Sequence, residues 1–138
     1  MCDKLLDTLD AAIQASPFIR FCQIRITKLD EAKGSLEMVM PPRAEFMRGE
    51  EGDGMFHGGP VAALIDTAGD FAVAASVGGV VPTVNFRVDY FRPAVGELKA
   101  VATTRRLGRA VCIADVDVYG ADGKLCAVGR GTYSGKAG

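Results

Sequence analysis

The spacing of apolar residues near the start of the chain predicts a short surface helix. Apolar side chains recur at helical spacing at Leu5, Leu6, Leu9, Ala12 and Ile13. This pattern predicts a helix over 3–15, within an N-terminal helical segment that we place at 1–19. The Ser16-Pro17 pair should end that helix, because the residue before a proline avoids the helical conformation.

A second, longer helix is predicted from 57 to 77, where apolar residues lie on every side of a helical projection. Such a helix is buried rather than amphipathic. It would be about 30 Å long, the width of a small domain. Gly78 should end it. The loop before it, 43–56, is rich in glycine and acid, and a loop of this length in a small domain is often functional.

Alternation of apolar and polar residues predicts the remaining elements as strands. They are expected over 21–29, 34–40, 83–91, 98–107, 110–119 and 125–133. Pro41-Pro42 should stop the second strand, and the turn at 121–124 is typical of a hairpin. The chain is therefore predicted to be a single α+β domain over 1–138. An antiparallel sheet would pack one face on a long central helix.

Composition narrows the classes of function. A length of 138 residues suits one domain, and a net charge of −1 argues against a nucleic-acid partner. No apolar run reaches the length expected of a membrane span, and the acidic start does not resemble a signal peptide, so a cytoplasmic location is expected. The four cysteines are scattered and there is one histidine, so no metal site is expected.

The run from His57 to Asp66 carries the strongest chemical signal. Gly58 and Gly59 open the predicted helix, where they allow a ligand to approach the backbone. The free N–H groups of a helix start favour negative charge. Asp66 follows two turns later on an apolar helix, where a carboxylate is costly without partners. Together these features predict an oxyanion site with a positioned base or nucleophile.

This order of elements resembles the hotdog fold, in which a sheet wraps a central helix. The motif is similar to that of the phenylacetate-pathway (PaaI-type) branch of the acyl-CoA thioesterases, over roughly residues 20–134. The matching stretches are His57-Gly58-Gly59 with Asp66, Thr83 to Ala94, Gly96-Glu97-Leu98, Gly108-Arg109 and Asp122-Gly123-Lys124.

The resemblance implies hydrolysis of an acyl-CoA thioester without metal or bound cofactor. The Gly58 N–H would polarise the thioester carbonyl, and Asp66 would act as nucleophile or as general base on water. Thr83 matches a hydroxyl that assists in some relatives. Such enzymes are homodimers or homotetramers (dimers of dimers), and the acid and the oxyanion site would come from different subunits.

One position departs from the family pattern. Many relatives carry Asn or Gln six residues before the histidine, where this chain has Glu51. A carboxylate donates a hydrogen bond only when protonated. We therefore hypothesise that Glu51 lies close to Asp66 and shares a proton in the site. The alternative is a solvated loop acid.

Four further residues are predicted to contact substrate, each with a structural alternative. His57 would shape the loop or touch substrate, and Gly59 would allow close approach. Asp70 lies one helical turn after Asp66, where a purely structural role is an alternative. Arg109 would meet the phosphates of CoA, although arginines on a hairpin are often only solvated.

The sequence favours a thioesterase for an apolar acyl or aryl group, because no charged cluster is dedicated to a polar one. One alternative is a hotdog domain that binds acyl-CoA without catalysis. The other is a hotdog hydratase or dehydratase, although the nine-residue step from His57 to Asp66 differs from the longer spacing expected there.

Overall fold

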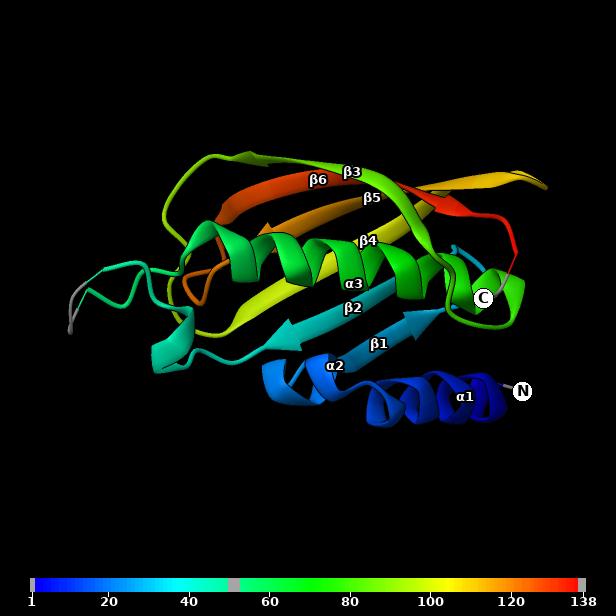
Figure 1. Cartoon of the computed structure of the whole chain (residues 1–138), viewed down its shortest axis with the longest axis horizontal. Coiled ribbons are helices and arrows are strands. Elements are labelled where there is room, and N and C mark those ends of the chain that lie inside the picture. The colour runs from blue at the N-terminus through cyan, green and yellow to red at the C-terminus, as the bar shows by residue number, and fades with distance from the viewer. Residues whose placement is uncertain (1, 50–52, 137–138) are drawn as a thin grey trace.

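The computed structural model describes residues 2–49 and 53–136 and has a curved antiparallel sheet around one long helix (Figure 1). The strands are β1 Arg25–Asp30, β2 Ser35–Met40, β3 Thr83–Tyr90, β4 Leu98–Leu107, β5 Val111–Tyr119 and β6 Leu125–Ser134. The helical elements are α1 Cys2–Ala15, α2 Pro17–Cys22, the short η1 Ala44–Phe46 and α3 Gly58–Val77. The six strands are ordered β1-β2-β4-β5-β6-β3. The predicted α+β class is confirmed.

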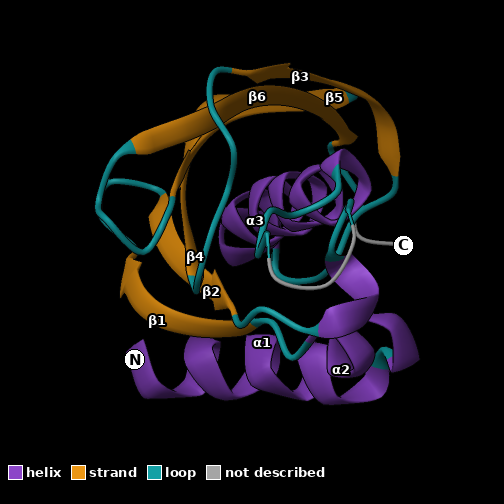
Figure 2. Cartoon of the chain, turned by 90° about the vertical axis from the view of Figure 1, so that its left-hand side faces the viewer, coloured by secondary structure: helices purple, strands orange, loops and turns teal. Residues whose placement is uncertain are grey.

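The helix α3 lies inside the curve of the sheet (Figure 2). Its fully buried side chains include Leu64, Ile65, Ala68 and Phe71. They meet alternate residues of the sheet's inner face, such as Leu36, Met38, Leu98, Ala100, Val116 and Val118. Burying one leucine-sized side chain is worth about 1.5–3 kcal/mol, so the side chains buried between α3 and the sheet contribute strongly to stability.

Both ends of α3 have local causes. His57 is extended and precedes the helix as its N-cap, so the helix begins one residue later than predicted. Gly78 ends it in the left-handed region at φ +90°, where its N–H donates to Ala74. A residue with a side chain would be strained there. The predicted central helix is thus confirmed to within one residue.

The strand predicted from 21 begins too early, because a second helix occupies the start of that range. Ser16 does end α1, but its hydroxyl also accepts a hydrogen bond from the Ile19 N–H and begins a second helix. Pro17 occupies the first position of α2, which proline favours. As a result α2 extends to Cys22, Gln23 ends it in the left-handed region, and β1 begins only at Arg25. A serine followed by proline signals a helix start as well as a helix end.

The chain does contain a helix long and apolar enough to cross a membrane, contrary to the sequence expectation. The helix is α3, and its most apolar 18 residues have a mean hydropathy of 1.3. Half of these residues are buried inside the protein. The core helix of a sheet-wrapped domain meets the same criteria of length and composition as a membrane span.

Candidate functional site

Asp66 and Thr83 form a hydrogen-bonded pair at the middle of α3. The Thr83 hydroxyl at the start of β3 donates to Asp66 Oδ1 over 2.8 Å, and both residues are half-buried. Burial raises the pKa of the Asp66 carboxyl above its usual range, and the bond from Thr83 partly offsets that rise. The structure therefore joins two of the predicted site residues in a partly dry environment, where a carboxylate is a stronger base.

The start of α3 leaves one backbone donor available. The Gly59 N–H donates to Nδ1 of His57 over 3.0 Å, so the histidine caps the helix. Pro60 has no N–H. Among the described residues no protein acceptor faces the Gly58 N–H. Within the described residues, the Gly58 N–H predicted to polarise the carbonyl thus has no protein partner, while His57 and Gly59 form the cap.

Tyr90 supports the same turn and was not predicted as a site residue. Its hydroxyl donates to the Gly58 carbonyl oxygen over 2.6 Å. A Cβ on residue 58 would lie 3.2 Å from that hydroxyl, a tight contact that a small shift of the exposed Tyr90 side chain relieves. The alternation within 83–91 placed Tyr90 on a strand, but nothing local in the sequence indicates that it reaches Gly58.

A pocket of about 370 Å³ opens beside Gly58. Its walls are mostly apolar and include Phe56, Val61, Phe91 and Ala94, while Arg48 and Arg92 also line it. An apolar pocket with a few polar groups is typical of a small-molecule site. Asp66 does not line this pocket.

Gly58 and Asp66 are too far apart to act together within one protomer. Eight residues separate them on α3, which corresponds to about 12 Å along the helix axis. If the Gly58 N–H bound a carbonyl oxygen while Asp66 acted at the carbon of the same carbonyl, the N–H and the carboxylate would have to lie within about 6 Å of each other. Within one chain the Gly58 N–H and the Asp66 carboxylate therefore lie in separate parts of the surface along α3.

Asp70 lies one turn beyond Asp66 and is also half-buried. Its Oδ1 accepts a hydrogen bond from the Val81 N–H over 3.1 Å, which ties the helix to the connection before β3. Burial raises the pKa of Asp70 to about 6; the Val81 bond opposes that rise, and the charge of Asp66 adds to it. These contacts agree with the structural alternative for Asp70.

Arg109 lies at the Thr83 end of the sheet and away from Gly58, and no described contact tests its predicted role. Arg109 is exposed in the turn between β4 and β5, and the ends of β5 and β6 meet there as the pair Val111 and Ser134. Gly58 lies near Tyr90, which pairs with Ala127 at the opposite end of β6. Arg109 therefore remains a prediction. Glu51 lies outside the described residues.

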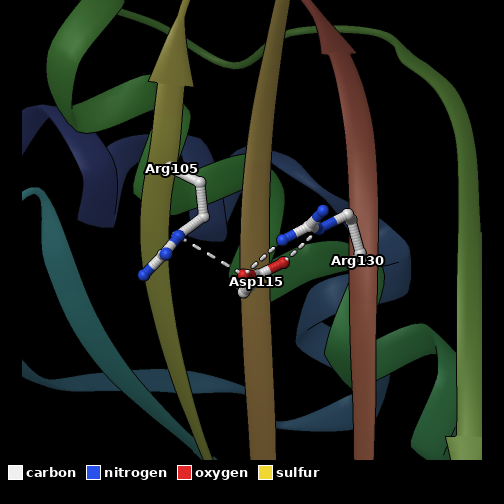
Figure 3. A network of polar contacts seen from close by, with 3 residues as sticks. All are labelled: Arg105, Asp115 and Arg130. Carbon is white, nitrogen blue, oxygen red and sulfur yellow. Dashed lines mark hydrogen bonds and ion pairs between the residues drawn. The ribbon is translucent and has the colours of Figure 1, made fainter.

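A separate polar cluster lies on the outer face of the sheet. Asp115 on β5 accepts hydrogen bonds from Arg130 on β6 and forms an ion pair with Arg105 on β4 at 3.5 Å. The hydrogen bonds from Arg130 hold the pKa of Asp115 below its usual value. Figure 3 shows this cluster in front of the strands, with α3 behind them. Exposed pairs of this kind contribute little stability, and Arg105 is engaged here rather than free for a phosphate.

Comparison with known proteins identifies the family. The thioesterase superfamily matches residues 53–127. A Halobacterium salinarum protein that carries the provisional name of an esterase is 35% identical over 114 residues, which are 75% of this chain and 76% of that protein.

Solved structures agree with that family. A Haemophilus influenzae thioesterase is 28% identical with a TM-score of 0.80, and the alignment covers 94% of this chain and 88% of that one. The PaaI protein of the E. coli phenylacetic acid degradation operon superposes with a TM-score of 0.84 at 22% identity, covering 99% and 95% of the two chains. The chain belongs to the thioesterase superfamily, and the predicted hotdog fold is confirmed.

Proposed function

We propose that this protein hydrolyses an acyl-CoA thioester to the free acid and CoA. The observation that carries the proposal is the Asp66–Thr83 pair, in which a carboxylate of raised pKa on α3 accepts a hydrogen bond from a hydroxyl on β3. The same helix begins at Gly58, whose N–H has no partner among the described residues. The N–H would polarise the thioester carbonyl and stabilise its oxyanion. Asp66 would act as general base on water or as nucleophile.

In the general-base form of the reaction, Asp66 takes a proton from water as the water oxygen bonds to the carbonyl carbon. The tetrahedral oxyanion then collapses, the carbon–sulfur bond breaks, and CoA leaves as the thiolate. Thr83 donates to one carboxylate oxygen, and its bond directs the other oxygen toward water. No cofactor enters these steps.

The complete site would form in a homodimer. β3 is an edge strand of the six-stranded sheet, and it exposes Val84 at 60% and Phe86 at 39% of their surfaces. An exposed apolar edge readily pairs with another strand. Antiparallel pairing of β3 with its copy would extend the sheet and cover these side chains. A homotetramer built from two such dimers remains part of the proposal.

The positions of Gly58 and Asp66 on α3 support this arrangement. Ala62 is midway between Gly58 and Asp66, so a twofold axis near Ala62 would set each Gly58 opposite the other protomer's Asp66. Ala62 and Ala63 are half-exposed and small enough for two helices to approach closely. On β3, Tyr90 contacts Gly58 and Thr83 contacts Asp66. If β3 paired with its copy about a point midway between Tyr90 and Thr83, Gly58 of one chain would again lie opposite Asp66 of the other.

The substrate we propose has an apolar acyl or aryl group, because the walls of the pocket beside Gly58 are mostly apolar. The His-Gly-Gly motif with a following acid favours the PaaI-type branch, and the likeness to the PaaI structure is compatible with it. A screen of short, medium, long and aryl acyl-CoAs by thiol release would identify the acyl group. Binding without thiol release would favour the non-catalytic alternative, and a change in enoyl absorbance would favour the hydratase.

Three substitutions test the roles of the site residues. Asp66→Asn should lower kcat by on the order of 100-fold or more while CoA binding persists. Gly58→Pro removes the N–H at a position where helices tolerate proline, and should also lower kcat by about 100-fold. Gly58→Ala retains the N–H and is the matched control. A folded Asp66→Asn protein that keeps a tenth of wild-type activity would refute the catalytic role.

Mixing the two inactive variants tests whether the site is shared. A mixed dimer of Asp66→Asn and Gly58→Pro chains has one intact site, because each chain supplies the group that the other lacks. Refolding the variants together should therefore restore roughly a quarter of wild-type activity. No recovery, or an active monomer by light scattering, would rule out a shared site.

A further inference from the structure

Tyr133 connects β6 to the helical turn that carries Asp66. Its side chain is fully buried, and its hydroxyl donates to the backbone carbonyl oxygen of Asp66 over 3.1 Å. In an α-helix this carbonyl also accepts from the N–H four residues later. The phenol therefore adds a bond between the sheet and the turn that holds the carboxylate.

Two glycines leave space for this side chain. A Cβ on Gly69 of α3 or on Gly131 of β6 would overlap the Tyr133 hydroxyl and ring. Neither glycine has the positive φ that would require glycine for backbone reasons. Glycine inside a helix or strand costs about 0.5–1 kcal/mol relative to alanine. Both glycines therefore lower the stability of their own helix or strand, and the space they leave is occupied by Tyr133.

The surroundings of Tyr133 keep its hydroxyl protonated. Its ring lies in an apolar cluster with Val73, Val81, Cys112 and Ala114. Burial raises the pKa of Tyr133, and the charges of Asp66 and Asp70 raise it further. The phenol is therefore protonated and a hydrogen-bond donor at neutral pH.

We infer that Tyr133 is a positioning residue for Asp66. Its hydrogen bond holds the turn of α3 that carries the carboxylate against β6, so that the carboxylate stays within hydrogen-bonding distance of the Thr83 hydroxyl. The inference rests on the proposed function of Asp66. Gly69 weakens the helix one turn after Asp66, where this bond supports it. A small displacement of a reacting group can lower a rate substantially, so the bond matters for turnover.

Tyr133→Phe removes only the hydroxyl. We expect kcat to fall about tenfold, because Asp66 loses its fixed position. KM should stay within twofold, because Tyr133 does not line the pocket beside Gly58. The Asp66 carboxyl, followed by carbon-13 NMR, should titrate at higher pH than in the wild type, because a nearby polar group is lost.

Ile13→Val on α1 is the matched control for lost stability. Ile13 is buried, and α1 contacts both β1 and α3 at the edge of the sheet opposite β3 (Figure 1). Ile13→Val should lower Tm by a few degrees without changing kcat or the titration of Asp66, because no polar contact of Asp66 is lost. Gly69→Ala provides a second approach, since its methyl group displaces the phenol. It should lower kcat in the wild type, and part of its effect should remain in Tyr133→Phe because the new Cβ also meets the ring carbons.

The outcomes separate the two proposals. A Tyr133→Phe protein with wild-type kcat and an unmoved Asp66 titration would refute the positioning role. An equal loss of kcat in Ile13→Val would also refute it. If instead the wild type releases no thiol from any acyl-CoA, the proposed function fails. The NMR titration then still decides whether Tyr133 positions Asp66, because it requires no turnover.

Discussion

Asp70→Asn should stabilise the protein at neutral pH and leave its stability unchanged near pH 3. Burial raises the pKa of Asp70 from 3.8 to about 6, so ionising this carboxyl in the folded protein is unfavourable. Below pH 3.8 the carboxyl is protonated in both the folded and unfolded states and costs nothing. As pH rises from 3.8 through 6, the folded protein retains a proton that the unfolded chain releases, and stability falls.

The magnitude follows from the difference between the two pKa values. That difference corresponds to about 3 kcal/mol of unfolding free energy above pH 7. Asp70 is only half-buried, and solvent screening reduces the figure to about 1.5 kcal/mol. Asparagine carries no charge, and its Oδ1 can still accept the hydrogen bond from the Val81 N–H. Asp70→Asn should therefore raise Tm by about 5 °C at pH 8.

Thermal unfolding between pH 3 and pH 8 measures this effect. Asp10→Asn, at an exposed position of α1, controls for the loss of one negative charge. Asp70→Ala removes the acceptor for Val81 and should destabilise the protein at pH 3, where charge plays no part. A gain in Tm that is equal at pH 3 and pH 8, or a lower Tm for Asp70→Asn at pH 8, would refute the reasoning.

Two further predictions concern catalysis. Thr83→Val should lower kcat/KM roughly tenfold and raise the pKa of Asp66, because the carboxyl loses its hydrogen-bond donor, whereas Thr83→Ser should behave like the wild type. Equal pH profiles of kcat/KM for the two variants would contradict this. Glu51→Gln should keep activity and extend it to higher pH, because the amide is a permanent donor, while Glu51→Ala should lose activity at every pH. Identical behaviour of the two Glu51 variants, with no alkaline limb in the wild type, would make Glu51 a solvated loop acid.

Local patterns were sufficient to predict most of the elements. The helical and alternating spacing of apolar residues identified α3 and the strands because burial on one face requires that spacing. Glycines at turns and helix ends identified boundaries because few other residues adopt left-handed backbone there. The pattern failed at α2, where a six-residue helix is too short to establish a period. There Ser16-Pro17 was the only available signal.

The sequence alone determined that one acid follows a glycine pair by two helical turns, and thus which residues to test. The tertiary structure decided which side chains meet them. Thr83 and Tyr133 lie 17 and 67 residues from Asp66 and contact it only because β3 and β6 pack beside α3. Such contacts depend on sheet order and register, which local periodicity does not encode. The 12 Å separation of Gly58 from Asp66 follows from helical rise alone, about 1.5 Å per residue over eight residues. That β3 forms an open edge of the sheet, on which the proposed dimer depends, is decided only by the folded strand order.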